Sequence, residues 1–230
     1  RLTGMQNVDG SLFYLDPARD GAMSCGWIFT DNKWYYASPS GALANGWQLI
    51  GGQWYWFDSL DGCSMVTGRR VIDGHPYLFG TYGLINGWCL DNGLWYWGSN
   101  GEVLTGWLQT GNNWYWLDPA NDGAMSRGIV SVGSSRYYLS DSGAMAVGWA
   151  FDSTDWYYAD GSGALASGWR SVNGAWYWLD IANDNRMVTG FFPIGSNRYH
   201  FSSTGALSLG WFMSDGDWYY AEPSYASGIV

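Results

Sequence analysis

The chain has 230 residues, of which 34 are glycine, 19% are aromatic and only 13% are charged, with a formal net charge of −10. This acidic balance excludes a nucleic-acid partner, because a basic surface supplies most of the affinity for a phosphate backbone, and it favours a neutral or cationic ligand instead. No apolar run reaches the roughly 18 residues of a transmembrane helix, so we expect a chain that does not span a membrane.

Glycines followed by a large side chain recur along the sequence at intervals of about twenty residues. They are Gly4, Gly26, Gly46, Gly68, Gly87, Gly106, Gly128, Gly148, Gly168, Gly190, Gly210 and Gly228. Repeats of this length are typical of a stacked fold. Each of the eleven units places aromatic and β-branched residues around turn dipeptides such as Asp31-Asn32, Gly51-Gly52, Asn92-Gly93 and Asn173-Gly174, as β-hairpins do. The sequence therefore predicts an all-β chain of about eleven hairpins with almost no helix.

From Gly46 onward a longer period groups the units in threes. First-type units carry Trp-Tyr-Trp and a long loop, as in WYWLDPANDGAMSRG, second-type units carry a weaker strand such as SRYYL, and third-type units carry a strong one such as DWYYA. We interpret residues 1–230 as one repeat domain, with a partial triplet over 1–46 in the pattern of a second and a third unit. Full triplets follow over 47–106, 107–168 and 169–228. Three hairpins per turn would stack units of one type in one column.

Stretches such as GWAFDSTDWYYADGSGALASGW and GWLQTGNNWYWLDPANDGAMSRG resemble the choline-binding, or cell-wall-binding, repeats of secreted Gram-positive proteins. The resemblance covers essentially the whole chain. It implies a left-handed β-solenoid with about three hairpins per turn and a ligand between consecutive hairpins. The implied walls are the Trp after the repeat glycine, the first Trp of the next strand, and the third aromatic of the following hairpin. Similar repeats in relatives bind glucan chains or host oligosaccharides.

An aromatic cage suits a quaternary ammonium ion, which donates no hydrogen bonds and gains roughly 0.5–2 kcal/mol from each ring face. Residues i and i+2 of a strand share a face, so the first and third aromatics of a Trp-Tyr-Trp strand point together and the middle one points away. We interpret the middle position as the inward, structural residue. It is aromatic in every unit: Phe13, Tyr35, Tyr55, Tyr77, Tyr96, Tyr115, Tyr137, Tyr157, Tyr177, Tyr199 and Tyr219.

Seven units carry both tryptophans of a pair. Four pairs have a complete third wall by this alignment: Trp27/Trp34 with Trp56, Trp88/Trp95 with Trp116, Trp107/Trp114 with Tyr138, and Trp149/Trp156 with Trp178. Three sites are degraded or partial: Trp47/Trp54 with Leu78, Trp169/Trp176 with His200, and Trp211/Trp218, which lacks a full following hairpin. Second-type units cannot form such a cage, because the pairs become Met5/Leu12, Arg69/Pro76, Ile129/Arg136 and Phe191/Arg198.

The sequence carries few signals of metal binding or catalysis. Asp-rich loops such as DPANDGAM indicate turns rather than a calcium site, and no Cys or His cluster has metal-ligand spacing. We expect Cys25, Cys63 and Cys89 to be small buried fillers. No catalytic motif is present, so we expect neither an enzyme nor a cofactor in this segment.

Our hypothesis is a non-catalytic module that anchors a secreted protein to the cell surface. Repeated weak cages would bind choline of teichoic acid, or another cell-wall polysaccharide, and gain avidity together. Two alternatives stay open: a glucan- or oligosaccharide-binding domain, since aromatic faces also stack on pyranose rings, and a structural stalk or adhesin whose tryptophans only form the core. The opening RLTG looks like the end of a repeat, so we expect a piece of a larger secreted protein.

Overall fold

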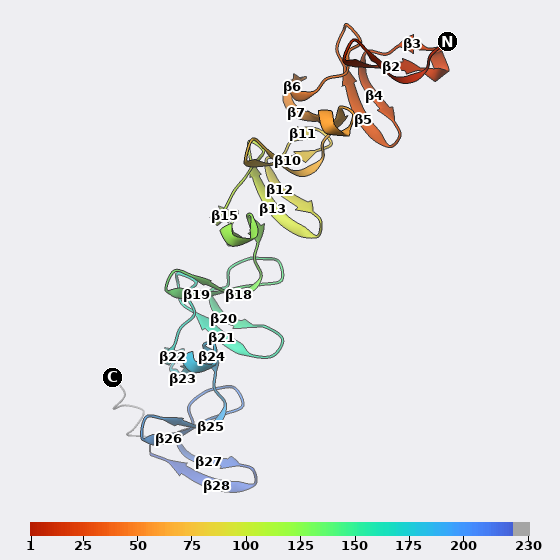
Figure 1. Cartoon of the computed structure of the whole chain (residues 1–230). Coiled ribbons are helices and arrows are strands. Elements are labelled where there is room, and N and C mark those ends of the chain that lie inside the picture. Colours follow the sequence, from red (N-terminus) through yellow and green to blue (C-terminus); the bar gives the residue numbers. More distant parts are fainter. Residues whose placement is uncertain (223–230) are drawn as a thin grey trace. The chain divides into compact units, whose positions relative to one another are not determined.

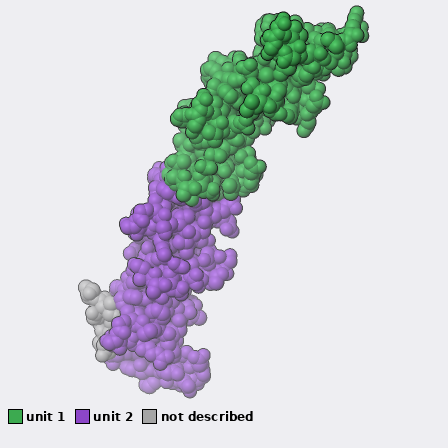
Figure 2. Space-filling model, viewed as in Figure 1, with its two compact units in different colours: residues 1–106, 117–125 green, residues 107–116, 126–230 purple. Residues whose placement is uncertain are grey.

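The structure is a computed structural model that describes residues 1–222 (Figure 1). The chain forms two compact units (Figure 2). The first comprises Arg1–Gly106 with Leu117–Met125, and the second comprises Trp107–Trp116 with Ser126–Val230, of which 126–222 are described. The division into one domain and triplets at 46, 106 and 168 stays a sequence prediction.

Eleven antiparallel hairpins follow one another along the described chain, which confirms the all-β prediction. Their paired strands are β1 (Gly4–Val8) and β2 (Ser11–Asp16), β4 (Gly26–Thr30) and β5 (Lys33–Ala37), β6 (Gly46–Ile50) and β7 (Gln53–Asp58), β9 (Gly68–Ile72) and β10 (His75–Gly80), β12 (Gly87–Asp91) and β13 (Leu94–Ser99), β15 (Gly106–Thr110) and β16 (Asn113–Asp118), β18 (Gly128–Val132) and β19 (Ser135–Leu139), β20 (Gly148–Phe151) and β21 (Trp156–Ala159), β22 (Gly168–Val172) and β23 (Ala175–Asp180), β25 (Gly190–Ile194) and β26 (Asn197–Phe201), and β27 (Gly210–Ser214) and β28 (Asp217–Ala221). Two-residue strands in the loops pair with these hairpins: β3 (Ala22–Met23), β8 (Ser64–Met65), β11 (Gly83–Leu84), β14 (Glu102–Val103), β17 (Ala124–Met125) and β24 (Arg186–Met187).

The hairpin tips adopt the predicted turn geometry. Asn92 and Gly93 have φ of 48° and 82°, and Asn173 and Gly174 have φ of 51° and 81°. A type I′ turn requires positive φ at both central residues, which Asn and Gly tolerate best, and its twist matches that of the flanking strands. Local turn chemistry therefore sets the register of each hairpin.

The helical content of residues 1–222 is four short 3-10 turns, η1 (Pro17–Arg19), η2 (Ser59–Asp61), η3 (Pro119–Asn121) and η4 (Ile181–Asn183). The aspartate before each turn, for example Asp180 before η4, accepts a hydrogen bond from the backbone N–H two residues later. The expected turn role of these aspartates is thus confirmed. The first hairpin also has this long loop, although its strand is of the weak second type. No helix in the described residues combines the length and apolar character needed to cross a bilayer.

Backbone contacts tie each hairpin to the loop that follows the next hairpin. In the first unit Leu43 N–H donates to Leu12 O at 2.8 Å, and Ala42 forms a β-bridge with Phe13. In the second unit Leu165 N–H donates to Arg136 O at 2.8 Å. A hairpin of this size cannot bury its own face, so these contacts join neighbouring hairpins into one packed array within each unit.

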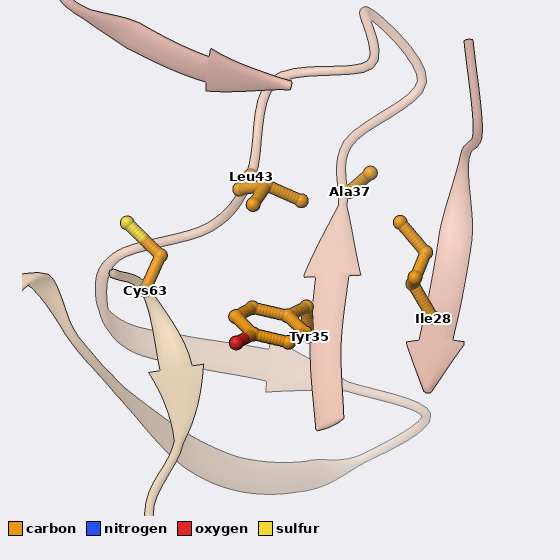
Figure 3. Packing of buried hydrophobic residues seen from close by; sticks show 5 residues of the cluster. All are labelled: Ile28, Tyr35, Ala37, Leu43 and Cys63. Atoms are coloured by element: carbon orange, nitrogen blue, oxygen red, sulfur yellow. The ribbon is translucent and has the colours of Figure 1, made fainter. Parts of the chain in front are cut away.

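The hydrophobic core lies between hairpins rather than within one. Figure 3 shows Ile28, Tyr35 and Ala37 of the second hairpin packed with Leu43 of its loop and with Cys63 from the loop of the following hairpin. Tyr35 and Ala37 lie two residues apart on β5 and share the inward face. Burying an aliphatic side chain such as that of Ile28 or Leu43 stabilises the fold by about 1.5–3 kcal/mol.

The middle aromatic position faces inward, as predicted. Tyr35, Tyr55, Tyr96 and Tyr157 are buried, and the other middle aromatics are half-buried except Tyr219 in the last described hairpin, which is 37% exposed.

The cysteine expectation was only partly right. All three thiols are free; Cys63 and Cys89 are buried, but Cys25 is exposed, because it lies in a loop between two hairpins.

Candidate functional site

In six hairpins the tryptophan after the repeat glycine meets the first aromatic of the second strand. The ring centroids are 6.2–6.4 Å apart and the ring planes cross at 83–89°. These pairs are Trp27/Trp34, Trp47/Trp54, Trp88/Trp95, Trp107/Trp114, Trp149/Trp156 and Trp169/Trp176. The register explains the geometry: Trp149 lies opposite Tyr158, so Trp156 is its diagonal neighbour on the same face. Each pair forms a corner of two indole rings.

The seventh pair, Trp211 and Trp218, is more exposed than the others. Trp211 and Trp218 are 70% and 65% exposed, and both lie in the last described hairpin, β27–β28. Gly228, which sequence analysis placed at the end of this unit, lies outside the described residues.

In three hairpins the third aromatic of the second strand contacts the glycine-linked tryptophan of its own hairpin. Trp178 is directly opposite Trp169 in its own hairpin, with ring centroids 5.4 Å apart. Trp56 contacts Trp47 in the same way, and so does Trp116 with Trp107.

Tyr138, the expected third wall for Trp114, also lies elsewhere. It stacks on Tyr157 of the next hairpin and donates a hydrogen bond to Phe151 O at 3.2 Å. Tyr138 thus contacts the following hairpin, and its combination with Trp107 and Trp114 in one cage stays a sequence prediction.

The following hairpin contributes its middle aromatic to the corner. Tyr55, Tyr77, Tyr137, Tyr177 and Tyr199 lie 4.7–5.1 Å, centroid to centroid, from the glycine-linked tryptophan of the preceding hairpin. The inward face of one hairpin packs on its predecessor, and the third aromatic points to the other face. Tyr55, Tyr137 and Tyr177 therefore lie next to the tryptophan corners where we expected Trp56, Tyr138 and Trp178.

Two of the tryptophan pairs that we expected to be degraded sites also have a tyrosine ring beside them. Trp47/Trp54 and Trp169/Trp176 were considered degraded because Leu78 and His200 occupy the third aromatic position. Leu78 is fully buried in the core. His200 stacks on Phe212 at 4.2 Å, away from this corner, and burial lowers its pKa.

The middle tyrosines next to these two pairs remain in place. Tyr77 lies 5.0 Å from Trp47, and Tyr199 lies 5.1 Å from Trp169, centroid to centroid. Both corners thus have a third ring. The signal that could have identified this ring is the aromatic character of the middle position in every unit.

Trp88 and Trp95 belong to the first unit and Trp116 to the second. The combination of these three residues in one cage stays a sequence prediction.

The sequence analysis did not identify a further side chain, a methionine or a leucine, that lies beside the rings in two of these corners. A cavity of about 380 Å³ is lined by Trp149, Trp156, Tyr177, Met187, Ser203 and Thr204. Met187 passes over Gly205, where an added Cβ would lie only 2.2 Å from the methionine sulfur. Gly205 also has φ of +79°, a conformation that favours glycine. The glycine after the loop thus makes room for the side chain next to the rings.

The corresponding cavity in the first unit is larger and more polar. It measures about 700 Å³ and is lined by Trp47, Trp54, Tyr77, Leu84, Gly52 and the amide side chains Gln53, Asn86 and Asn100. Leu84 stands where Met187 stands in the other cavity, and it passes over Gly101 in the same way. Neither lining includes a charged residue.

Trp54 and Trp156 each line one of these two cavities, whereas Trp114 and Trp176 line neither cavity. The sequence predicts that each of these two residues forms one wall of a cage. In the structure each forms a corner with the glycine-linked tryptophan of its hairpin, and the ring centroids are 6.4 Å apart for Trp114 and 6.3 Å apart for Trp176. Trp114 is 39% exposed and Trp176 is half-buried. The two corners are therefore candidate sites on ring geometry alone.

The backbone at these two tryptophans is held by the loop that follows the next hairpin. Trp114 O accepts from Met145 N–H at 2.8 Å, and Trp176 O accepts from Leu207 N–H at 2.7 Å. The position of each ring thus depends on the neighbouring repeat, which sequence spacing within one unit does not reveal.

Three of the four second-type hairpins carry an arginine in place of a tryptophan of the pair: Arg69, Arg136 and Arg198. The Arg198 guanidinium carbon lies 4.2 Å from the ring centroid of Phe191, and that of Arg69 lies 5.9 Å from Tyr96. Arg136 forms an ion pair with Asp184 at 2.6 Å. In these three hairpins an arginine thus stands in place of one tryptophan of the pair.

The ionisable side chains next to Trp34 differ from those next to Trp156. Lys33, next to Trp34, donates to both carboxylate oxygens of Asp61, and this hydrogen bond raises the pKa of Lys33 and lowers that of Asp61. In the second unit, Tyr157 follows Trp156 on β21. Its side chain is 1% exposed and donates a hydrogen bond to Asp152 Oδ2 at 2.9 Å. Burial, with this hydrogen bond, raises the pKa of Tyr157 to about 12. In residues 1–222 no group of three or more His, Cys, Asp and Glu side chains is arranged to hold a metal ion.

Two family models match the chain. The choline-binding repeat matches residues 44–82, and the cell wall binding repeat matches 26–43, 105–125, 147–165, 167–180 and 210–224. Together they account for more than half of the chain. No curated protein sequence matches it.

Solved structures of pneumococcal surface proteins are similar to the chain over nearly its whole length. Choline-binding protein F from Streptococcus pneumoniae, crystallised in the presence of a peptidoglycan analogue, is 26% identical, with a TM-score of 0.72 over 93% of this chain and 89% of that one. CbpJ from S. pneumoniae is 29% identical, with a TM-score of 0.60 over 96% and 93%. The repeat spacing, the tryptophan corners, the family models and these similarities agree: the chain belongs to the choline-binding, cell-wall-binding repeat family.

Proposed function

We propose that the chain is a non-catalytic module that anchors a secreted protein at the bacterial surface by binding choline groups of teichoic acid. The observation that carries this proposal is the cavity of Trp149, Trp156, Tyr177 and Met187. Three ring faces and a thioether, with no charged lining, match a trimethylammonium group, which needs π-faces and offers no hydrogen-bond donor.

Five candidate cages have a tryptophan pair and a tyrosine wall within one unit. They are Trp27/Trp34/Tyr55, Trp47/Trp54/Tyr77, Trp107/Trp114/Tyr137, Trp149/Trp156/Tyr177 and Trp169/Trp176/Tyr199. The first tryptophan of the second strand stays accessible, with Trp34 at 39% and Trp156 at 44% exposure. Several such cages on one polymer would multiply weak individual affinities.

The relatives support this assignment. Choline-binding protein F has also been crystallised with soaked ipratropium, at 25% identity and a TM-score of 0.56 to this chain. The triplet pattern and the backbone ties between consecutive hairpins favour a solenoid with about three hairpins per turn. Its left-handed sense is what the resemblance to the choline-binding repeats implies. An extracellular location on the cell surface follows from the proposed polymer partner.

A second candidate function, carbohydrate binding, is favoured by one cavity. Around Trp47, Trp54 and Tyr77 lie the side-chain amides of Gln53, Asn86 and Asn100. Aromatic platforms with neutral amides suit the apolar face and the hydroxyl groups of a pyranose.

Affinity chromatography and fluorescence separate the two candidates. We expect the protein to be retained on a tertiary-amine resin and to elute with free choline, and choline to change the fluorescence of the tryptophans. Passage through that resin, combined with retention on immobilised dextran or glycans, would overturn the choline proposal in favour of carbohydrate.

A further inference from the structure

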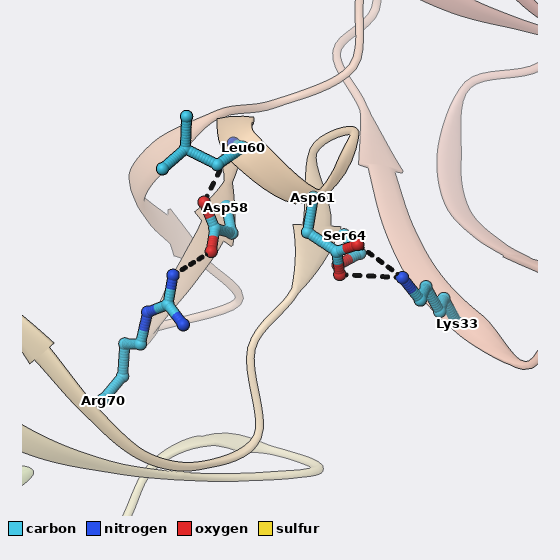
Figure 4. A network of polar contacts seen from close by, with 6 residues as sticks. All are labelled: Lys33, Asp58, Leu60, Asp61, Ser64 and Arg70. Atoms are coloured by element: carbon cyan, nitrogen blue, oxygen red, sulfur yellow. Dashed lines mark hydrogen bonds and ion pairs between the residues drawn. The ribbon is translucent and has the colours of Figure 1, made fainter.

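An ion pair in the first unit joins the strand of Trp34 to the loop of the following hairpin. Lys33 immediately precedes Trp34 on β5, and its Nζ lies 2.6 and 2.8 Å from the two carboxylate oxygens of Asp61 (Figure 4). Asp61 also accepts a hydrogen bond from Ser64 Oγ at 2.6 Å, and Ser64 immediately precedes Met65 on β8. Trp34 and Met65 line one cavity of about 600 Å³, which the ion pair also borders. The pair therefore connects two segments that each carry a residue of that cavity wall.

The equivalent hairpin of the second unit has the same connection with the charges reversed. Asp155 immediately precedes Trp156, the first residue of β21, and its Oδ2 lies 3.3 Å from Arg186 Nη1. Arg186 and Met187 are the two residues of β24, so their side chains leave opposite faces of the strand. Trp156 and Met187 line the cavity of about 380 Å³, and neither member of the ion pair does. This pair thus joins two cavity-lining segments from outside the cavity.

The two ion pairs occupy one place in the repeat. β5 lies beside β8, and β21 lies beside β24. Lys33 and Asp155 hold the same repeat position. An ion pair attracts with either polarity, whereas the effect of one nearby charge on a bound cation would have opposite signs in the two units. The feature that both units share is therefore the connection and not the sign of either charge.

A third strand pair shows that the strands dock without an ion pair. β13 lies beside β17 in the first unit, and these strands begin with Leu94 and Ala124 at the positions of the charged residues. Neither side chain can carry a charge. Substitutions in the two ion pairs should therefore leave the fold intact.

We propose that the ion pair has a positioning role in both units: it holds the second tryptophan of the corner at a fixed distance from the methionine of the following loop. In the second unit the positioning residues are Asp155 and Arg186, and the positioned residues are Trp156 and Met187. The inference rests on the proposed choline binding and adds residues that do not touch the ligand. Trp156 is 44% exposed, so packing restrains its ring on one side only, and the ion pair restrains the strand at the point where this ring begins.

The test transplants the ion pair of the first unit into the second. The three substitutions Asp155→Lys, Asn183→Asp and Arg186→Ser reproduce the first-unit residues at the equivalent positions. The single substitution Asp155→Lys breaks the pair, because it opposes two cations. Choline titrations are followed through the indole ¹⁵N–H resonances of Trp156 and Trp34, assigned by Trp→Phe substitution. Trp34 is the internal control, since its own ion pair is unchanged.

We expect Asp155→Lys and Arg186→Gln each to weaken choline binding at Trp156 by about two- to fivefold, the range of a partly exposed ion pair. The transplant should restore the affinity to within about twofold. Arg186→Gln separates positioning from charge, because removing a cation would by itself strengthen the binding of another cation. Tighter binding in Arg186→Gln, or a transplant as weak as Asp155→Lys, would overturn the inference. A lower urea midpoint with unchanged choline affinity would also overturn it, because it would leave the pair a purely structural role.

The methyl group of Met187 gives a readout that needs no ligand. Because Met187 lines the cavity together with the tryptophan rings, ring currents should shift its methyl ¹H resonance upfield. The resonance should move toward the value of free methionine in Asp155→Lys and return in the transplant. An unchanged methyl resonance in Asp155→Lys contradicts this inference alone, whereas a wild type without a choline response at Trp34 and Trp156 contradicts the proposed function. If Asp155→Lys does not fold, the same comparison is made with Arg186→Gln.

Discussion

Tyr177 lies 4.7 Å from Trp149, ring centroid to ring centroid, with the ring planes crossing at 67°, although the two residues belong to consecutive hairpins. The neighbouring Trp178 is directed to Trp169 of its own hairpin instead. The contact between Tyr177 and Trp149 joins two consecutive hairpins at the proposed site. Substituting Tyr177 therefore tests this site directly.

Replacing Tyr177 by alanine should weaken choline binding at the Trp156 cage by about two- to thirtyfold, which is the loss of one cation–π contact of roughly 0.5–2 kcal/mol. The matched variant Trp178→Ala should leave binding there unchanged, since Trp178 points to the opposite face. Titration followed through the Trp156 indole resonance measures both. A larger loss in Trp178→Ala than in Tyr177→Ala would restore the third aromatic as the wall.

Gly205→Ala should displace Met187, because the new Cβ would lie 2.2 Å from the methionine sulfur. We expect a severalfold loss of choline affinity at the Trp149/Trp156 cage, and a loss of about 1–2 kcal/mol in unfolding free energy from positive φ. Gly174→Ala is the control, with φ of +81° and no atom within 4 Å of the added Cβ. It should lose similar stability in urea unfolding but keep the affinity; equal affinities in both variants would exclude Met187 from the site.

The double substitution Phe191→Trp/Arg198→Trp should create a binding site. It removes the guanidinium that covers Phe191 and restores a tryptophan pair beside Tyr219, whose ring lies 5.0 Å from that of Phe191. Calorimetric titration with choline should show one additional site. An unchanged stoichiometry in a folded variant would mean that a tryptophan pair and one tyrosine are insufficient.

Stability should fall as the pH rises through the range from about 10 to about 12, partly because of Tyr157. Its pKa is raised in the folded state to about 12, so the unfolded chain loses this proton first and unfolding becomes easier with rising pH. The contribution is present in full below pH 10 and amounts to at most about 3 kcal/mol. Urea unfolding of the wild type and of Tyr157→Phe between pH 9 and 12 should show a shallower decline for the variant. Parallel declines would contradict the assignment.

Asp180→Ala should cost about 0.5–2 kcal/mol of stability, the usual loss for an N-cap, because Asp180 Oδ1 accepts from Ala182 N–H at 3.1 Å. Asp180→Asn keeps an acceptor and should cost less.

Thermal unfolding with and without calcium chloride should give the same midpoint for the wild type. A calcium-dependent rise that is lost in Asp180→Asn would indicate that these loops bind the ion.

Sequence alone determined the hairpins, their turns and the tryptophan pairs, because all three depend on short-range chemistry. Positive φ at Asn173 and Gly174 fixes one hairpin's register, and the two-residue period of a strand then places Trp176 diagonal to Trp169 in that hairpin. Only the tertiary structure decided that Tyr177 rather than Trp178 contacts Trp149, and that Met187 lines the same cavity as these rings. These features depend on which face of one hairpin packs on the preceding one, and a step of one residue reverses that face.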